Sequence, residues 1–325
     1  MRRLLVLGLL TLALVPGASG KDLAGEAARA KPLLGIFGDA NRFEQLTGQR
    51  SSVRHVILGW NQGLTWGKPV GQLLPTLTPV PMIGVGTKSG WPGPKEVITP
   101  LGIAEGKGDA YLVALNRAFA AFEGDLIYFR PLGEMNGHWN AYCAFRQNGS
   151  SKGPQYATTA FRKAFARMYL IVHGGKSVNG RLKALGLPPV NGELEENPMP
   201  RLRVIWNPQG YGAPDIPANS TQAYYPGDKY VDVVGNDLYH QNFKSEWAAN
   251  QRLYDAHPNK PYSFPEWGLW AIDDPKFIET MAEFVRTHRR VELVAYFDSV
   301  PGSTWDLASK PKSKAAYRKL ITPLG

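Results

Sequence analysis

Cysteine is nearly absent from this sequence: among 325 residues the only one is Cys143. A single thiol excludes an internal disulfide, so the fold must be held together by packing alone. No histidine-rich stretch surrounds Cys143, and a thiol without an activating neighbour is seldom a nucleophile. We therefore expect Cys143 to be a buried apolar residue.

The sequence also lacks the short motifs that hold metals, nucleotides or a serine nucleophile. It has no Cys/His zinc spacing, no H-E-x-x-H, no G-x-S-x-G, no P-loop and no EF-hand loop. We predict an activity that uses no metal and no cofactor.

Long apolar runs are missing after the first residues. Residues 1–20, MRRLLVLGLLTLALVPGASG, place two arginines before an apolar stretch and small residues after it, which is the pattern of a secretory signal peptide. The apolar stretch is shorter than the roughly 20 residues that span a bilayer. We predict a secreted protein, extracellular or periplasmic, with an uncleaved anchor as the alternative.

Acidic residues are outnumbered by basic ones, 27 to 37, and the net charge is +10. A basic surface can serve nucleic acid or an acidic polymer. Lysine and arginine are scattered here, however, and the only dense run, KPKSK, spans residues 310–314 near the end of the chain. We expect a solvated basic surface, no nucleic-acid partner, no membrane contact after signal cleavage, and a monomer.

Eight short apolar runs alternate with segments of helical periodicity. The runs span residues 33–37, 53–60, 80–86, 125–132, 202–206, 231–239, 261–267 and 291–297. Residues 108–124, 157–174 and 274–290 carry apolar residues at helical spacing, and Asp109 could cap the first of these helices. Apolar strands that alternate with helices indicate a parallel sheet, and eight strands are what a closed (β/α)8 TIM barrel needs.

The chain after the signal peptide carries no linker, so residues 21–325 are predicted to form one domain. The longest irregular stretch, residues 175–201, is interpreted as an inserted loop. An open doubly wound α/β sheet is the alternative fold. It would usually carry a glycine fingerprint on its first turn, and GIFGDA at residues 35–40 lacks that spacing.

Two glutamates follow buried runs. Glu134 lies in RPLGEMNGHW just after the fourth run, and Glu266 lies in FPEWG at the end of the seventh. Catalytic groups of a (β/α)8 barrel come from the carboxyl ends of its strands, so both should face one mouth. Such a pair suits glycoside hydrolysis, in which one carboxylic acid protonates the leaving oxygen and a second carboxylate attacks the anomeric carbon.

The segments around these glutamates resemble glycoside hydrolase family 26, the mannanase family of the clan A glycosidases. RPLGEMNGHW is similar to the family's acid/base segment, and FPEWG to its nucleophile strand. VIWNP at 204–208 and YYPGDKYVDVVGNDLY at 224–239 are similar to its fifth- and sixth-strand regions. The resemblance covers about residues 33–308 and implies that Glu134 is the acid/base and Glu266 the nucleophile. It further implies site-lining roles for Arg130, Asn136, Trp139, Trp206 and Tyr239.

One departure from the family pattern concerns the substrate. The histidine that precedes the family's acid/base is Gly133 here. In clan A barrels that neighbouring polar residue helps to orient the catalytic centre and the sugar. The resemblance therefore supports retaining chemistry better than it supports mannan as the substrate.

The positions of four further side chains in the sequence suggest where they lie in the fold. Asp237 lies two residues before Tyr239, and strand alternation would turn both to one face. His138 could contact a sugar or belong to the loop, whereas Trp305 follows the eighth run and offers a flat face for a sugar ring. His55 is expected to be a hydrogen-bonded core histidine.

The sequence thus predicts a secreted retaining endo-glycosidase that acts on a β-linked polysaccharide or oligosaccharide, with β-mannan as the first choice. Two alternatives stay open: a clan A enzyme for β-glucan, xylan or an acidic surface glycan, and a polysaccharide-binding barrel without turnover.

Overall fold

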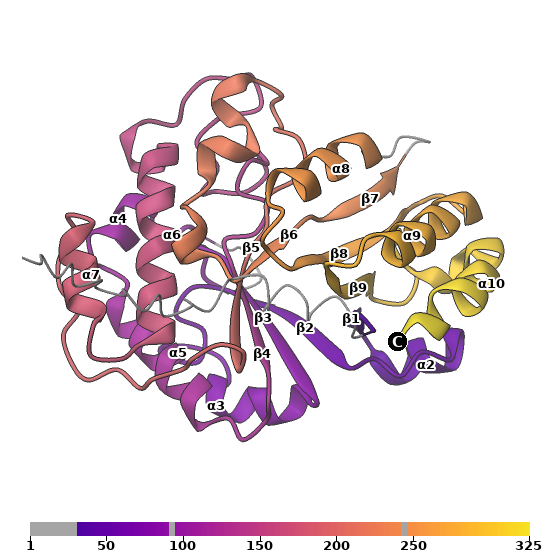
Figure 1. The fold of residues 1–325 in the computed structure, drawn as a ribbon, viewed down its shortest axis with the longest axis horizontal. Coiled ribbons are helices and arrows are strands. Elements are labelled where there is room, and N and C mark those ends of the chain that lie inside the picture. The colour runs from indigo at the N-terminus through magenta and orange to yellow at the C-terminus, as the bar shows by residue number, and fades with distance from the viewer. Residues whose placement is uncertain (1–30, 91–94, 242–245) are drawn as a thin grey trace, which may run out of the picture.

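The computed structural model describes residues 31–90, 95–241 and 246–325. Its strands form one closed parallel barrel with helices around it (Figure 1). The strands are β1 (Leu33–Gly38), β2 (Val53–Leu58), β3 (Val80–Val85), β4 (Ile127–Pro131), β5 (Leu202–Trp206), β6 (Val233–Gly235), β7 (Leu238–Gln241), β8 (Tyr262–Trp270) and β9 (Val291–Ser299). The ring closes because β1 pairs with β9 and β6 pairs with β8, which confirms the predicted (β/α)8 barrel. The predicted signal peptide lies outside the described residues.

The sixth barrel position differs from the single strand predicted over residues 231–239. It consists of β6, which pairs with β5 and with the start of β8, and β7, which pairs with the end of β8. Asn236 and Asp237 lie between the two pieces. On β8 the register with β9 shifts between Phe264 and Trp267, around Pro265 and Glu266. Two carboxylates therefore lie at irregular points of neighbouring strands, where a ladder can turn a side chain toward a site.

The helices bear out the predicted periodicity within a few residues. They are α2 (Ala40–Thr47), α3 (Val70–Leu73), α4 (Pro100–Ala104), α5 (Asp109–Ala121), α6 (Thr158–His173), α7 (Val178–Ala184), α8 (Trp247–Ala256), α9 (Pro275–Thr287) and α10 (Pro311–Leu320). The stretch 175–201, predicted as a loop, contains the short helix α7. None of the helices within the described ranges is long and apolar enough to cross a membrane.

The predicted cap by Asp109 is wrong. No side chain caps α5, and the Asp109 carboxylate instead accepts hydrogen bonds from Nε (2.7 Å) and Nη2 (2.5 Å) of Arg167 on α6. The Arg167 side chain is fully buried. A buried guanidinium without a partner would be strongly destabilising. The helix end loses less, because water can replace a side-chain cap. The ion pair therefore joins two helices on the outside of the barrel.

The barrel interior is filled by side chains from most of its strands. Near its amino-terminal end a cluster packs together that comprises Val53, Met82, Tyr128, Ile205, Val233, Leu293 and Ala295. Cys143 is completely buried, as predicted, with its sulfur 3.7 Å from Oδ1 of Asn219. Because this cluster fills the amino-terminal end of the barrel, the carboxyl ends of the strands form the face that is open to a ligand.

Candidate active site

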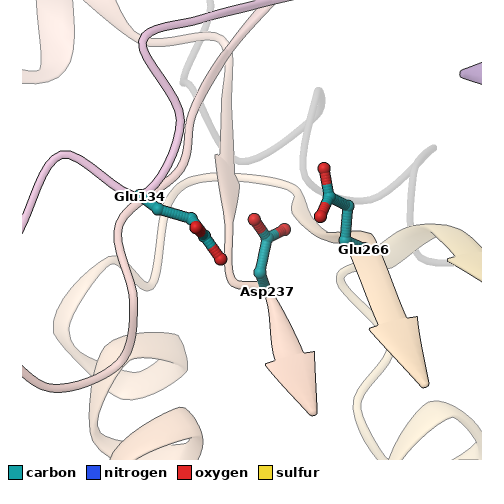
Figure 2. Close-up of side chains that lie close together, drawn as sticks. All are labelled: Glu134, Asp237 and Glu266. Carbon is teal, nitrogen blue, oxygen red and sulfur yellow. The ribbon is translucent and has the colours of Figure 1, made fainter. Parts of the chain in front are cut away.

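Three carboxylates meet at the carboxyl ends of the strands. Glu134 lies in the loop after β4, Asp237 lies between β6 and β7, and Glu266 lies in β8 (Figure 2). Each offers one oxygen, and these three oxygens lie within 4.8 Å of one another. The two glutamates that the sequence placed at one mouth are thus neighbours in the fold.

The loop that carries Glu134 has an unusual backbone. Leu132 (φ 50°) and Glu134 (φ 54°) both occupy the left-handed region that residues with a Cβ seldom adopt. The Glu134 amide donates to the Asn207 carbonyl at 2.6 Å, which holds the turn against the end of β5. Backbone strain of this kind persists where surrounding contacts fix it, and it is concentrated at functional sites.

This loop is rich in glycine because side chains pack closely against its backbone. A Cβ at Gly137 would lie 2.4 Å from Cε2 of Trp139, so the indole can fold back only over a glycine. In that position the indole Nε1 donates to Oε2 of Glu134 at 2.6 Å. Gln209, which follows β5, donates through Nε2 to the other oxygen, Oε1. Both oxygens of Glu134 are therefore held by donors.

The environment of Glu134 favours a proton on its carboxyl group. Burial raises the pKa of Glu134, and the nearby charge of Glu266 raises it further. The Arg130 guanidinium and the hydrogen bonds from Trp139 and Gln209 act in the opposite direction but do not cancel the rise. A carboxylic acid with a raised pKa can donate a proton near neutral pH.

We expect the Gln209→Met substitution to move the alkaline limb of the pH–rate profile to higher pH. Gln209 donates to the ionised form of Glu134 and so lowers its pKa; without that bond, Glu134 keeps its proton to higher pH. Activity at the optimum should fall less than about tenfold, because Glu134 itself remains. The kcat/KM profile from pH 4 to 10 measures this. An unchanged alkaline limb would contradict the assignment of that limb to Glu134.

Glu266 is held by two donors, one from across the barrel and one from the neighbouring strand. Nη1 of Arg130, on β4, donates to its Oε1 at 2.9 Å, and the hydroxyl of Tyr239, on β7, donates to its Oε2 at 2.8 Å. Glu266 is buried. The two bonds fix the orientation of the carboxylate, as a nucleophile that must meet one carbon atom requires.

Arg130 connects most of the site. Its Nε donates to Oδ1 of Asn207 at 2.5 Å, and its two Nη atoms pair with Asp237 and Glu266. Burial alone would lower the pKa of Arg130, but the carboxylates around it raise it above its ordinary value. Burial raises the pKa of Asp237 well above its ordinary value, although Arg130 opposes that rise.

Gly133 provides the space that the Arg130 side chain occupies. A Cβ at Gly133 would lie 2.6 Å from both Cζ and Nη2 of Arg130. A residue with a side chain, such as the family's histidine, would therefore require the guanidinium to move. The Gly133 carbonyl also accepts a hydrogen bond from the hydroxyl of Tyr142 at 2.6 Å. The glycine is thus matched to the position of Arg130 in this chain.

The carboxylates lie where two cavities meet. One has a volume of about 480 Å³, the other about 510 Å³, and both are lined by Glu134 and Glu266. Both sizes lie within the range of ligand-binding clefts. The first is rich in aromatic side chains: Trp139, Tyr211, Tyr239, Trp270, Phe297 and Trp305. The second lies at the ends of β2, β3 and β4.

Most predicted site residues line these cavities. Arg130, Trp139, Asp237, Tyr239 and Trp305 do so beside the two glutamates. Gln209, Tyr211, Trp270 and Phe297 also line the first cavity and were not predicted as site residues. Trp270 could have been found, because it ends the strand that carries Glu266. Gln209 has no comparable sequence signal.

Three predicted site residues lie elsewhere. Trp206 is fully buried and packs against Tyr225 and His257, with ring centroids 4.8 and 5.4 Å away. Asn136 is also buried, and its amide bonds the backbone of residues 209 and 211 at 2.8 to 2.9 Å, so that it supports the loop that carries Gln209. His138 stacks edge-on against Trp139 at 5.3 Å and lines neither of the two cavities.

The expectation for His55 is confirmed for its burial and wrong for its hydrogen bonds. It is buried on β2, but neither ring nitrogen has a hydrogen-bond partner within the described part of the chain. Its Nδ1 lies 3.9 Å from Oε1 of Glu266. Burial lowers the pKa of His55 well below its ordinary value, and the Arg130 charge lowers it further. The imidazole of His55, next to Glu266, is therefore neutral.

The three carboxylates are also the grouping that could hold a cation. Two of them, Asp237 and Glu266, already share the guanidinium of Arg130. Arg130 thus supplies the positive charge that a bound metal would bring, and the chemistry open to the site is that of an acid and a carboxylate placed side by side.

The family model described as glycosyl hydrolase family 26 matches residues 206–305. This segment contains Asp237, Tyr239 and Glu266 and begins after Glu134. The chain is similar to glycosyl hydrolase family 26. The resemblance inferred from the sequence motifs is thereby confirmed.

The chain is also similar to two curated proteins, an endoglucanase and a mannan endo-1,4-beta-mannosidase. Endoglucanase H of Acetivibrio thermocellus is 24% identical over 292 residues, which cover 86% of this chain and 28% of that protein. Mannan endo-1,4-beta-mannosidase A and B of Caldalkalibacillus mannanilyticus is 28% identical over 145 residues, 45% of this chain and 22% of that protein. The matches thus span about a quarter of the length of these relatives.

Solved structures of family 26 share the fold. The GH26 domain of an endo-beta-mannanase/endo-beta-glucanase from Prevotella bryantii has a TM-score of 0.55 at 14% identity, with 94% of each chain covered. A GH26 beta-mannanase from Bacteroides ovatus has a TM-score of 0.54 at 15% identity, with 94% of this chain and 93% of that chain covered.

Proposed function

We propose that this chain is a retaining endo-glycoside hydrolase that cleaves a β-linked polysaccharide, with β-mannan as its first substrate. The observation that carries the proposal is the Glu134–Glu266 pair, whose nearest oxygens lie within 4.8 Å. Retaining enzymes hold their two carboxyl groups about 5 to 5.5 Å apart, whereas inverting enzymes need roughly 6.5 to 9.5 Å to admit a water molecule. Single oxygens that approach this closely fit the first arrangement better than the second, which supports a nucleophile over a water-activating base.

The different surroundings of the two glutamates support a different role for each. Glu134, whose pKa is raised, donates its proton to the glycosidic oxygen as the bond to the leaving sugar breaks. At the same time an oxygen of Glu266 forms a bond to the anomeric carbon. Water then attacks that carbon and gives a proton to Glu134, and the bond to Glu266 breaks. Tyr239 and Arg130 hold Glu266 in place during both steps.

The substrate class is supported by the names of the relatives and by the cleft. One relative is an endoglucanase and the other a mannan endo-1,4-beta-mannosidase. The aromatic side chains of the first cavity offer flat faces for the apolar faces of pyranose rings. We keep β-glucan as a second candidate substrate. The match to the endoglucanase covers 86% of this chain, whereas the match to the mannosidase covers 45%.

We expect the purified protein to release reducing ends from β-1,4-mannan or from a β-1,4- or mixed-linkage β-glucan. A reducing-sugar assay on a panel that also includes xylan tests this. Proton NMR of the first-formed product should show the β-anomer, because two displacements restore the starting configuration. First formation of the α-anomer would overturn the retaining mechanism. Retention of the polymer without new reducing ends would instead indicate a binding protein.

We also propose that the chain is exported from the cell. Export is supported by the pattern of residues 1–20 and suits an enzyme whose substrate is a polymer outside the cell. Amino-terminal sequencing of the protein recovered from its native culture would test cleavage near residue 20.

A further inference from the structure

A buried histidine lies beside the catalytic pair but has no part in the mechanism described above. His55 is on β2, and its side chain is completely buried. It lines neither of the two cavities, so it lies apart from the place of a bound glycan. Its Nδ1 is nevertheless 3.9 Å from Oε1 of Glu266, the oxygen that also accepts from Arg130. An effect of His55 on the reaction would therefore pass through Glu266 rather than through the sugar.

The strands on either side of β2 hold the imidazole of His55 in place. On β1, the ring of Phe37 meets it edge-on, with the ring centroids 5.4 Å apart. On β3, a Cβ at Gly84 would lie 3.3 Å from its Nε2, so the ring packs against backbone there. The imidazole thus points Nε2 toward β3 and Nδ1 toward Glu266.

The two ring nitrogens of His55 have different surroundings. Among the described residues neither has a hydrogen-bond partner, but Nδ1 faces a carboxylate oxygen whereas Nε2 faces Gly84. Burial and the charge of Arg130 lower the pKa of His55, so the ring is neutral and carries its single proton on one of the two nitrogens. A carboxylate attracts an N–H group and repels a lone pair. The proton is therefore expected on Nδ1.

We propose that His55 is a positioning residue for Glu266, whose carboxylate its Nδ1–H group faces and binds while the glycosyl-enzyme forms and breaks. In the free protein the contact of 3.9 Å is too long for a hydrogen bond. Hydrogen bonds at catalytic groups are often long without substrate and tighten in the complex. The inference rests on the proposed hydrolase function and adds a support for the nucleophile to it.

This support comes from a direction that the other two donors leave open. Arg130 reaches Glu266 from β4 and Tyr239 reaches it from β7, whereas His55 approaches from β2, beyond β1 and β9 in the order of the strands. A neutral donor restricts the movement of the carboxylate without adding charge. A second cation beside Oε1 would stabilise the free carboxylate more than the covalent intermediate and would slow the first step.

The position of the proton is tested by long-range proton–nitrogen NMR of the nitrogen-labelled full chain. The imidazole resonances of His55, assigned by their loss in His55→Asn, should show a protonated Nδ1 and an unprotonated Nε2 at neutral pH. A proton on Nε2 would refute the proposal. This measurement needs no substrate, so its result is separate from that of the proposed function.

Kinetics test the effect on the reaction. His55→Phe should lower kcat on the glycan that the chain hydrolyses by about tenfold and change KM little, because His55 lines neither cavity. His55→Asn should recover most of the activity, because its amide nitrogen can take the place of Nδ1. His55→Gln should not, because its amide nitrogen extends to the place of Nε2.

His257→Phe is the matched control, with thermal melting of every variant as the measure of folding. His257 is also a buried histidine whose pKa is lowered by burial, but it packs against Trp206 and Tyr225. This variant should keep the wild-type kcat. If His55→Phe keeps it too, or if His55→Asn and His55→Gln are equally impaired, the positioning role is refuted although the hydrolase stands. If the wild type hydrolyses no glycan, the proposed function itself fails.

Discussion

Replacing Glu266 with alanine is expected to reduce kcat by about 10⁴-fold or more on every glycan that the chain hydrolyses. Without this carboxylate no glycosyl-enzyme bond can form, so both natural substrates and activated aryl glycosides should be affected. Added azide should restore some turnover of an aryl glycoside by attacking the anomeric carbon directly. Because a single displacement inverts that carbon, the product should be the α-glycosyl azide.

Replacing Glu134 with alanine should give the contrasting pattern. Substrates with a poor leaving group should lose about 10² to 10⁴ in rate, the contribution of a positioned acid. An aryl glycoside needs little protonation to leave, so its first step should survive and the covalent intermediate should accumulate. Azide should then attack this intermediate and give the β-glycosyl azide, with the configuration of the substrate.

Steady-state kinetics and NMR of the azide products distinguish these cases. Glu279→Ala is a suitable control, because Glu279 is exposed on α9, where it pairs with Lys276. If the two azide patterns appear with the residues exchanged, the roles are reversed but the glycosidase proposal survives. If neither substitution reduces turnover, the site has been placed in the wrong part of the barrel.

The sequence was sufficient for the barrel and for the two glutamates because both depend on local patterns. Seven of the eight apolar runs each form one strand whose ends the turn residues mark, and the two glutamates follow such runs. The sixth position shows the limit of this reasoning. Asp237 and Tyr239 were expected on one face of a single strand, and both do line the first cavity. Asp237 reaches it, however, because it lies in the break between β6 and β7.

Residues whose roles depend on partners distant in sequence could not be predicted. Trp206 and Trp305 both lie near strand ends, yet Trp206 packs into a buried cluster with Tyr225 whereas Trp305 lines the first cavity. The partners of Arg130 lie 77, 107 and 136 residues away along the chain. Sequence alone indicated that a strand arginine must be paired, but only the closed barrel brings these partners together.

Arg130→Met is expected to lower kcat/KM by at least about 100-fold and to destabilise the protein by about 3 to 5 kcal/mol, because it leaves buried carboxylates without their cation. The substitution removes the guanidinium that orients Glu266 and that opposes the raised pKa values of Glu134 and Asp237. Glu134 must be protonated to act as the acid. Its pKa should rise further in the variant, so the alkaline limb of the remaining activity should move to higher pH.

The stability loss should depend on pH in a defined direction. Asp237 has a raised pKa in the folded state, so the folded protein binds its proton more tightly than the unfolded chain does. Stability then falls as pH rises above about 4, the ordinary pKa of an aspartate. Without Arg130 this fall should continue to higher pH, because the pKa of Asp237 in the folded state rises further. Urea unfolding between pH 4 and 8 should therefore show the variant closest to the wild type at the acid end.

Arg203→Met is the matched control for this experiment. Arg203 on β5 pairs with Glu292 on β9, near the opposite end of the barrel, so it is an ion-paired strand arginine outside the site. Its loss should cost stability without moving the alkaline limb of the pH–rate profile. If both variants leave that limb in place, Arg130 is a structural residue and does not tune Glu134. If Arg130→Met alone moves it to higher pH, the guanidinium that Gly133 accommodates sets the proton affinity of the acid.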